Sequence, residues 1–485
     1  MAAMAQVMDW PVMEADALEM ALWSAAEIAA ATGGEASGDF LCAHVATDSR
    51  EVGDGTLFVA LKGESMDGHR FVEQAFQRGA SAVLVDRPVD GPHVLVADTF
   101  AALQALAAHA RARTEAKVVG VTGSVGKTGV KEAIWAALDR ASRGAAHRSL
   151  KSYNNHVGVP LSLSRMPARS AYGVFEMGMN HAGEIAALSP QVRPHVAVIT
   201  TIAPAHIENL GSMEAIAEAK AEIFLGLEPG GVAVIPADSP HCDQLRAAAE
   251  RAGAQVVTFG AAAGANVRLL DAVAAPGGGS LVTIDMGERR LCYTVATPGE
   301  HHVINSLAVM ATVRALGADL GAAGLALAEM EGMAGRGARS TIAVAGGEAL
   351  LIDESYNANP ASMRAALDLL GAAEGKRKVA ILGDMLELGG QARALHAAVA
   401  SDIERNEIDT VYAAGPLMQA LYEAIPAARR GAHAPDAATL QPIVLEALRP
   451  GDVVMIKGSN GSRMGPLVAA IRAHFAQSSE QPARG

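Results

Sequence analysis

A glycine-rich segment near residue 120 holds the residue types with the clearest chemical use. It reads Gly-Val-Thr-Gly-Ser-Val-Gly-Lys-Thr from Gly120 to Thr128, after an apolar run and before a helical pattern. Glycines let backbone N–H groups turn toward phosphate oxygens, and the start of a helix adds partial positive charge. The ammonium of Lys127 can neutralise the β and γ phosphates of ATP, and the Thr128 hydroxyl can bind magnesium. We therefore expect a phosphate loop that consists of Thr122, Gly123, Ser124, Val125, Gly126, Lys127 and Thr128.

Two alternatives compete with this interpretation. The strict phosphate-loop pattern has glycine where this chain has Val121, so the segment could be an ordinary glycine turn before a helix. A phosphate loop is also shared by kinases, switches, motors and ligases. The loop therefore predicts nucleotide binding and leaves the reaction open.

Two residues beyond predicted strand ends could hold magnesium. Glu176 follows a strand over 172–175, and His206 follows a strand over 195–200. The carboxyl ends of parallel strands face the crevice where ligands bind, and carboxylate oxygens suit magnesium. Taken singly, a solvated glutamate and a hydrogen-bonded loop histidine are the alternatives. Their repetition at successive strand ends after a phosphate loop favours a metal site.

Parallel sheets must position these residues, because short β-branched runs alternate with alanine-rich helical runs along most of the chain. We expect an α/β fold with three domains, over residues 1–115, 116–335 and 336–485. In the first we expect strands over 55–61 and 82–85 and a helix over 71–78. In the second we expect strands over 117–121, 172–175, 195–200 and 232–235, then a strand-rich region over 254–295. In the third we expect strands over 349–353, 378–382, 410–413 and 453–456.

The composition excludes several classes of protein. The chain has 485 residues and a net charge of −13, from 52 acidic and 39 basic residues, whereas a protein that coats nucleic acid is usually basic. Cys42, Cys242 and Cys292 are odd in number and widely spaced, which indicates no disulfide framework and favours a reducing compartment. The first 25 residues carry acids and no early base, unlike a secretory signal, and no apolar stretch is long enough to span a membrane. We therefore expect a cytoplasmic protein with no nucleic-acid partner.

The order of motifs along the chain resembles the Mur ligase family of peptidoglycan precursor synthesis. The resemblance covers nearly the whole chain and rests on Thr122–Thr128, Asn154–Pro160, Glu176–Asn180, His206 and Ala219–Lys220. The segments Asp353–Met363 and Leu382–Gly389 resemble those of the member that adds D-alanyl-D-alanine. The segments Thr47–Arg50, Gly55–Gly63 and Asp67–Phe71 resemble a UDP-sugar-binding domain, which the relative that adds the third residue shares. The Asp-Asn-Pro-Arg signature of the diaminopimelate-adding relative is absent.

The resemblance implies a central phosphate-loop, ATP-binding domain with a parallel sheet, flanked by a UDP-sugar-binding domain and a Rossmann-like carboxy-terminal domain. It implies that Thr128, Glu176, His206 and Lys220 bind magnesium, and that Lys220 is carbamylated. By helical periodicity alone Lys220 is a solvated lysine. The resemblance overrides that interpretation, because a carbamate is an anion that can hold the cation.

The resemblance also assigns roles to further residues. The implied catalytic residues are Lys127, Lys220, His206 and Arg336, and the implied ATP contacts beyond the phosphate loop are Asn305, Arg336, Asp353 and Tyr356. The implied UDP-substrate contacts are Ser49, Arg50, Lys62, Asp67, His69, Asn154 and Asn155. Asn357 and Asn359 are implied to place a dipeptide, with turn formation before Pro360 as the alternative. The family's usual residue at position 302 is asparagine, and this chain has His302.

The implied activity is ATP- and Mg²⁺-dependent ligation. An acyl phosphate would form on UDP-N-acetylmuramoyl-tripeptide, and the amine of D-alanyl-D-alanine would displace phosphate to give the pentapeptide precursor of peptidoglycan. Roles in cell wall biogenesis, cell shape, division and the cell cycle would follow. We expect a monomer that acts on small molecules and closes at a hinge near Gly332–Gly337. The alternatives are a ligase that adds the third residue, an enzyme similar to folylpolyglutamate synthase, and a nucleotide-gated switch.

Overall fold

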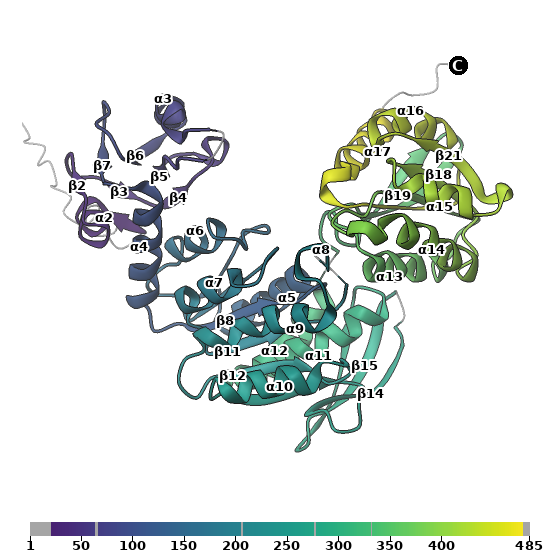
Figure 1. Cartoon of the computed structure of the whole chain (residues 1–485), viewed down its shortest axis with the longest axis horizontal. Helices are drawn as coiled ribbons and strands as arrows, with labels where there is room; N and C mark the ends of the chain where they lie inside the picture. The colour runs from purple at the N-terminus through teal and green to yellow at the C-terminus, as the bar shows by residue number, and fades with distance from the viewer. Residues whose placement is uncertain (1–20, 64–65, 205–206, 276–277, 331, 479–485) are drawn as a thin grey trace, which may run out of the picture.

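The computed structural model describes residues 21–63, 66–204, 207–275, 278–330 and 332–478. Within these residues the strands form sheets of two, five, nine and six strands. The five-, nine- and six-stranded sheets follow one another along the chain, each with its own helices, and we refer to them as the amino-terminal, central and carboxy-terminal parts (Figure 1). The predicted α/β fold with parallel sheets is confirmed.

The amino-terminal part is a five-stranded sheet in the order β2-β7-β6-β5-β4, in which only the β2–β7 pair is antiparallel. The strands of this part are β1 (Trp23–Ser24), β2 (Glu35–Ala36), β3 (Leu41–Cys42), β4 (His44–Ala46), β5 (Thr56–Val59), β6 (Ala80–Val85) and β7 (His93–Leu95), where β1 pairs with β3. Its helices are α2 (Ala25–Thr32), α3 (Val72–Gln77) and α4 (Thr99–Ala112), with 3-10 turns η1 (Ser49–Glu51) and η2 (Gly68–Phe71). Asp98 begins α4, since its carboxylate accepts hydrogen bonds from the first free backbone N–H groups of that helix.

The central part is a nine-stranded sheet in the order β16-β15-β14-β13-β12-β11-β8-β10-β9, parallel from β14 to β9 and antiparallel at the other edge. Its strands are β8 (Lys117–Thr122), β9 (Ala146–Arg148), β10 (Tyr172–Glu176), β11 (Val196–Ile199), β12 (Val232–Pro236), β13 (Gln255–Gly260), β14 (Val267–Ala274), β15 (Ser280–Asp285) and β16 (Arg290–Val295). Its helices are α5 (Lys127–Ala141), α6 (Gly158–Ser164), α7 (Glu184–Val192), α8 (Ile207–Leu210), α9 (Met213–Ala221), η3 (Glu222–Gly226), α10 (Cys242–Arg251), α11 (Glu300–Ala315) and α12 (Leu320–Glu329). The predicted strand-rich region after residue 254 therefore corresponds to the strands β13 to β16.

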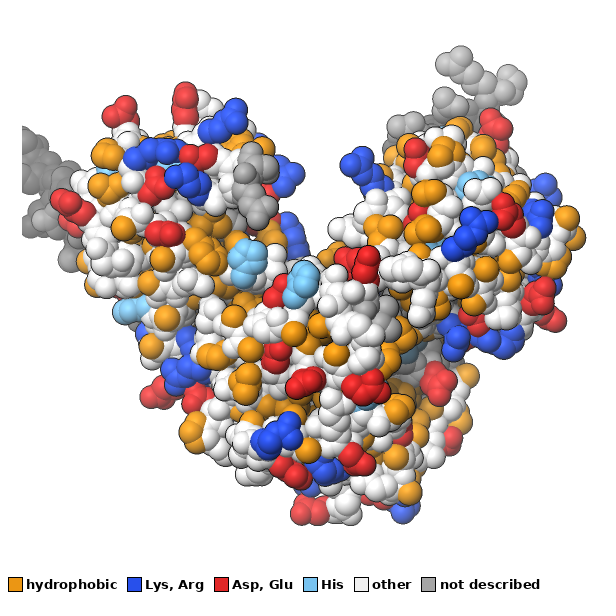
Figure 2. Space-filling view, in the orientation of Figure 1, with side chains coloured by type: hydrophobic (Ala, Val, Ile, Leu, Met, Phe, Trp, Pro, Cys, Tyr) orange, Lys and Arg blue, Asp and Glu red, His pale blue; other side chains and the backbone are white. Residues whose placement is uncertain are grey.

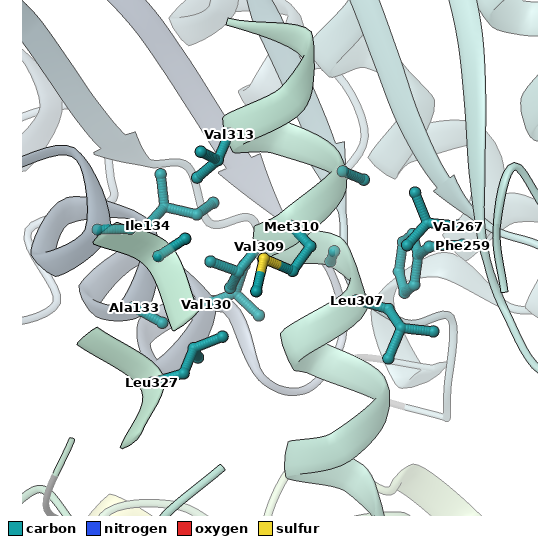
Figure 3. Packing of buried hydrophobic residues seen from close by; sticks show 14 of the residues in the cluster. Val130, Ala133, Ile134, Phe259, Val267, Leu307, Val309, Met310, Val313 and Leu327 are labelled. Atoms are coloured by element: carbon teal, nitrogen blue, oxygen red, sulfur yellow. The ribbon is translucent and has the colours of Figure 1, made fainter. Parts of the chain in front are cut away.

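The helix that follows the phosphate loop is held by the core of the central part. Val130 and Ile134 of α5 are buried against Val309 and Met310 of α11 and against Leu327 of α12 (Figure 3). A second cluster of buried residues, from α7, α9 and η3 among others, covers the opposite face of the same sheet. Close packing on both faces fixes the start of α5 relative to the ends of the neighbouring strands.

The carboxy-terminal part is a six-stranded sheet in the order β17-β18-β22-β19-β20-β21, parallel except for β17. Its strands are β17 (Ala338–Val344), β18 (Gly347–Glu354), β19 (Arg377–Gly383), β20 (Thr410–Ala414), β21 (Arg430–Ala434) and β22 (Asp452–Lys457). Its helices are α13 (Pro360–Gly371), η4 (Gly389–Gln391), α14 (Ala392–Arg405), α15 (Met418–Ala424), η5 (Ala427–Arg429), α16 (Ala437–Ala447), η6 (Asn460–Ser462) and α17 (Met464–Ser478). Helices α13 to α15 cover one face and α16 and α17 the other. No helix in the described part of the chain is long and apolar enough to cross a membrane.

Candidate active site

The phosphate loop joins β8 to α5 at the carboxyl ends of the parallel strands. Gly123 and Gly126 have φ angles of +147° and +86°, where glycine carries no steric cost. A Cβ atom on Gly123 would lie 2.0 Å from Oγ1 of Thr200, and one on Gly126 would lie 2.9 Å from the side chain of Asn305. These glycines therefore let the loop approach β11 and α11 more closely than any other residue would allow.

The side chain of Lys127 folds back over the loop. Its Nζ donates to the carbonyl oxygen of Gly123 at 2.7 Å. Burial lowers the pKa of Lys127, the carboxylate of Glu176 opposes that shift, and the guanidinium of Arg336 adds to it. A desolvated cation beside a second cation is a favourable place for a polyanion such as a nucleotide phosphate.

Glu176 is the last residue of β10, and its side chain is 1% exposed, so the alternative of a solvated glutamate is wrong. Its Oε2 accepts a hydrogen bond from Oγ1 of Thr128 at 2.7 Å, and its Oε1 accepts one from Nδ2 of Asn154, also at 2.7 Å. Its backbone N–H donates to Oγ of Ser149 at 3.1 Å. The carboxylate is thus fixed beside the hydroxyl of the phosphate loop, where magnesium binding was predicted.

Lys220, near the end of α9, is also buried, at 1% exposed. The interpretation as a solvated helix lysine is therefore wrong, because helical periodicity does not account for the packing of this face of α9 against the sheet. Within the described residues its Nζ has no hydrogen-bond partner. Burial lowers its pKa well below the usual value, the charge of Lys127 adds to this shift, and Glu222, Glu184 and Glu176 oppose it.

The residues at this end of the sheet fit a magnesium ion in part as they stand. The described chain contains no cluster of three or more His, Cys, Asp or Glu side chains that could hold a metal. The hydroxyl of Thr128 and the carboxylate of Glu176 would offer two oxygen ligands. The buried amine of Lys220, which has no hydrogen-bond partner among the described residues, would supply a third group once it is converted to an anion. His206, the fourth predicted ligand, lies outside the described residues.

A cavity lies beside the phosphate loop, between α5, α11 and the carboxy-terminal part. Its wall includes Asn305 and the adjacent imidazoles of His301 and His302, whose ring centroids are 4.1 Å apart. Burial lowers the pKa of His302 to about 3, so this ring is neutral near pH 7. A neutral imidazole and an amide offer donors and acceptors without charge, which suits a nucleotide base next to a phosphate site.

The carboxy-terminal part contributes Arg336 and Tyr356 to the same cavity. The guanidinium of Arg336 lies 4.0 Å from the centroid of the Tyr356 ring, and one of its nitrogens lies 3.5 Å from Oγ of Ser152. Asp353 is not part of the wall of this cavity, and its contact with ATP stays a prediction. Its carboxylate accepts hydrogen bonds from the backbone N–H of Gly335 at 2.9 Å and from Oγ of Ser355 at 2.6 Å. Asp353 therefore fixes the backbone next to Arg336 in the segment before β17, which is the junction between the central and carboxy-terminal parts.

Asn357 and Asn359 lie in the turn before α13. Oδ1 of Asn359 accepts a hydrogen bond from the backbone N–H of Ser362 at 2.8 Å and so caps the helix, as the turn alternative predicted. Oδ1 of Asn357 accepts one from the backbone N–H of Ala358 at 2.9 Å. Both asparagines also line the cavity, and their contact with a dipeptide remains a prediction.

Lys457 is a residue of this cavity that the sequence analysis missed. It ends β22, is 2% exposed, and its Nζ lies 2.9 Å from the carbonyl oxygen of Asn357 and 3.5 Å from the carboxylate of Glu354. Burial lowers its pKa. The signal was present, since a lysine directly after the predicted strand 453–456 follows the same strand-end rule that identified Glu176.

The predicted UDP-substrate residues fall in two regions. Lys62, Asp67 and His69 lie together at the carboxyl ends of β5 and β6, where Nδ1 of His69 is 2.7 Å from the Asp67 carboxylate. Ser49 and Arg50 follow β4 in η1, and Arg50 pairs with Asp48 at 2.5 Å. Asn154 and Asn155 belong instead to the central part, where Asn154 contacts Glu176 and Asn155 accepts a hydrogen bond from the first N–H of α6 at 2.8 Å.

Three family models match successive stretches of the chain. They are "Mur ligase family, catalytic domain" over residues 42–120, "Mur ligase middle domain" over 121–313 and "Mur ligase, glutamate ligase domain" over 339–460. A protein of Bacillus subtilis (strain 168) named UDP-N-acetylmuramoyl-tripeptide--D-alanyl-D-alanine ligase is 36% identical over 434 residues, which cover 87% of this chain and 92% of the relative.

Solved structures agree with these matches. A crystal structure of MurF from Acinetobacter baumannii has a TM-score of 0.79 and 32% identity, covering 93% of this chain and 99% of that one. A crystal structure of MurF ligase from Thermotoga maritima in complex with ADP has a TM-score of 0.72 and 26% identity, covering 90% and 98%. The predicted three-domain architecture is thereby confirmed, while the boundaries at residues 115 and 335 remain predictions.

Proposed function

Because the chain belongs to the Mur ligase family, we propose that it joins D-alanyl-D-alanine to the terminal carboxylate of UDP-N-acetylmuramoyl-tripeptide with ATP as the energy source. The observation that carries the proposal is the meeting of Lys127, the Thr128–Glu176 pair and the buried amine of Lys220 at one end of the central sheet. The relatives that match most of this chain bear the name of this activity. The product is the pentapeptide precursor of peptidoglycan.

The reaction needs a carboxylate to approach the triphosphate, so both negative charges must be screened. A carboxylate oxygen of the tripeptide attacks the γ-phosphorus, the bond from that phosphorus to the β–γ bridging oxygen breaks, and ADP leaves. Lys127 would neutralise the transferred group, and Arg336 lines the cavity beside the phosphate loop from the carboxy-terminal part. Magnesium held by Thr128 and Glu176 would supply further charge screening.

The second step forms the C–N bond. The amine of D-alanyl-D-alanine attacks the acyl carbon, inorganic phosphate leaves, and the nitrogen loses a proton. Because an acyl phosphate hydrolyses readily, water must be excluded from the cavity beside the phosphate loop. Asn357 and Asn359, which line that cavity, are our candidates for placing the dipeptide.

Lys220 is proposed to carry a carbamate. Its neutral amine adds to CO₂ with release of one proton, which leaves an N-carboxylate in place of an ammonium. The lowered pKa favours the neutral amine that this addition requires, and the absence of a hydrogen-bond partner for Nζ among the described residues leaves it free to react. The resulting anion would balance Lys127 and complete an oxygen-ligand set for magnesium.

The proposal assigns UDP-sugar binding to residues 1–115, ATP binding to 116–335 and closure over the nucleotide to 336–485. Lys62, Asp67 and His69 form one polar group at the carboxyl ends of β5 and β6, which supports a polar-ligand site there. We also propose that the protein acts in the cytoplasm, because ATP and the sugar-nucleotide substrates occur in that compartment. We propose that it acts there as a monomer.

The experiment that tests the function is an assay of phosphate release with ATP, Mg²⁺, UDP-N-acetylmuramoyl-tripeptide and candidate amines. We expect release only when D-alanyl-D-alanine and the tripeptide are both present, together with a product of the mass of the pentapeptide. Turnover with a single amino acid and a UDP-dipeptide would identify a ligase for the third residue instead. Release with neither acceptor nor amine would indicate a nucleotide switch and would exclude the ligase.

A further inference from the structure

Residues 149–155, which we call the bridging loop, connect β9 to α6 and contact all three parts of the protein. Its contacts with the central part include those of Ser149 and Asn154 with Glu176. Its contact with the carboxy-terminal part is that of Ser152 with Arg336, at 3.5 Å. Its contacts with the amino-terminal part are made by Lys151 and Tyr153.

The inner end of the bridging loop is fixed tightly to the magnesium site. The backbone N–H of Gly178 donates to the carbonyl oxygen of Asn154 at 2.8 Å, and a Cβ atom on Gly178 would lie 2.8 Å from the Asn154 side chain. Asn154 therefore cannot shift without moving either the segment after β10 or the carboxylate of Glu176 that it holds.

A buried lysine ties the same loop to the helix of the phosphate loop. Lys131 lies one helical turn after Lys127 and is 0% exposed. Its Nζ donates to the carbonyl oxygens of Ser149 at 2.7 Å and Lys151 at 3.1 Å. A cation that bonds two backbone carbonyls of one loop fixes the loop backbone and not only a side chain.

The outer end of the bridging loop is held by one carboxylate of the amino-terminal part. Glu51 accepts hydrogen bonds from Nζ of Lys151, from the hydroxyl of Tyr153, and from a guanidinium nitrogen of Arg165 at 3.2 Å. Glu51 is the last residue of η1, the turn that begins at Ser49. A ligand that contacts Ser49 at the start of η1 therefore acts on Glu51, which holds the bridging loop.

We propose that Glu51 is a positioning residue for the Glu176 carboxylate, acting through the bridging loop, and that it links acceptor binding at the amino-terminal sheet to magnesium–nucleotide binding. The proposal rests on the proposed function for the identity of the acceptor. It follows from a continuous series of contacts. Lys151 and Tyr153 donate hydrogen bonds to Glu51, and Asn154, the next residue after Tyr153, donates one to Glu176. By linkage, whatever the acceptor adds to nucleotide affinity, the nucleotide must add to acceptor affinity.

The test measures the affinity of a non-hydrolysable ATP analogue by calorimetry, with and without UDP-N-acetylmuramoyl-tripeptide. In the native protein we expect the acceptor to tighten nucleotide binding about 5-fold or more, a usual size for coupling between sites. In Glu51→Ala we expect the ratio of nucleotide affinities with and without the acceptor to fall to nearly one. Glu51→Gln, which can still accept from Tyr153, should keep part of the ratio, and Tyr153→Phe should lose part of it.

A matched control is Glu329→Ala, which removes a carboxylate paired with Arg140 on the exposed surface of the central part at 2.6 Å. It should leave the ratio unchanged. A second readout is the same titration without Mg²⁺, in which the native protein should lose the coupling because the loop acts on the magnesium carboxylate. If Glu51→Ala does not fold, Tyr153→Phe and Glu51→Gln carry the test.

Three results would overturn the inference. They are a native ratio near one, a ratio unchanged in the Glu51 and Tyr153 variants, and coupling that persists without Mg²⁺. Failure of the proposed function gives a different pattern, since coupling would be present while no pentapeptide forms. Failure of the native protein to bind the UDP-tripeptide would overturn both.

Discussion

Lys127 is the single cation that touches the backbone of the phosphate loop, among the side-chain contacts described for that loop. We predict that Lys127→Met lowers kcat/KM by roughly 30- to 1,000-fold, which corresponds to about 2–4 kcal/mol of lost transition-state stabilisation. Steady-state kinetics of phosphate release measures this loss. The control is Lys117→Met at the start of β8, the strand that leads into the phosphate loop, where Nζ donates to the carbonyl oxygen of Leu316 at 3.0 Å. Equal kinetics for the two variants would contradict the assigned role.

Lys220 gives a prediction about stability as well as activity. Its pKa is 10.5 in an unfolded chain and well below that value in the folded protein, so between these two values the unfolded chain binds more protons. The free energy of unfolding must therefore rise as the pH rises toward 10.5, and it must fall as the pH drops from 10.5 toward the lower pKa of the folded protein. We expect Lys220→Met to lack this contribution, to exceed the native protein in stability near pH 7 in CO₂-free buffer, and to lose ligation. Parallel curves of unfolding free energy against pH for the two proteins would refute the burial of a neutral amine.

Residue type and spacing were enough to find the phosphate loop and Glu176, because a strand, glycines and a helix follow one another locally. They were not enough for Lys220, whose burial depends on packing between α9 and the sheet. The contact of Asn154 with Glu176 joins two segments that are separate in sequence, so no local pattern could reveal it. The resemblance supplied Lys220 and assigned Asn154 to the UDP-substrate, which stays a prediction, but it did not give the contact of Asn154 with Glu176.

At the scale of elements, the turn between β8 and α5 gives the sharpest prediction. Gly123→Ala places a Cβ atom 2.0 Å from Oγ1 of Thr200 at a φ of +147°, so we expect it to destabilise the fold by at least about 1–3 kcal/mol. Nucleotide binding should weaken with it, because the loop must move away from β11. Gly129→Ala is the matched control, since nothing lies within 4 Å of its Cβ position in α5. We expect that control to stabilise the protein by about 0.4–1 kcal/mol in urea unfolding. Equal unfolding midpoints would contradict the strained geometry of the loop.

Most central strands of the two larger sheets were predicted to within a few residues, because buried parallel strands are continuous apolar runs. The edge strands β17 and β21 were not predicted. β21 reads Arg-Gly-Ala-His-Ala, which has neither alternation nor β-branched residues, and it forms because the open edge of β20 provides a partner. Edge strands of this kind are set by their neighbours and not by their own sequence.

At the scale of the whole molecule, the carboxy-terminal part stands apart from the amino-terminal part across a broad recess whose floor is the central part (Figure 2). Arg336 lies at the junction and faces both Tyr356 of the carboxy-terminal part and Ser152 of the bridging loop. The turn at this junction is tight, because a Cβ atom on Gly332 would lie 2.2 Å from the carbonyl oxygen of Gly337. A small rotation about these glycines would move the whole carboxy-terminal sheet relative to the nucleotide cavity.

We predict that nucleotide and acceptor together close this recess. Closure excludes water from the acyl phosphate and brings Arg336 toward the transferred phosphate, so it should require both ligands. Small-angle X-ray scattering should therefore show a smaller radius of gyration with a non-hydrolysable ATP analogue, Mg²⁺ and UDP-N-acetylmuramoyl-tripeptide than with none of them. Arg336→Ala should weaken the change while each ligand still binds, because the guanidinium is the described contact between the junction and the bridging loop. Scattering profiles that superimpose with and without both ligands would mean that the carboxy-terminal part is already in its working position.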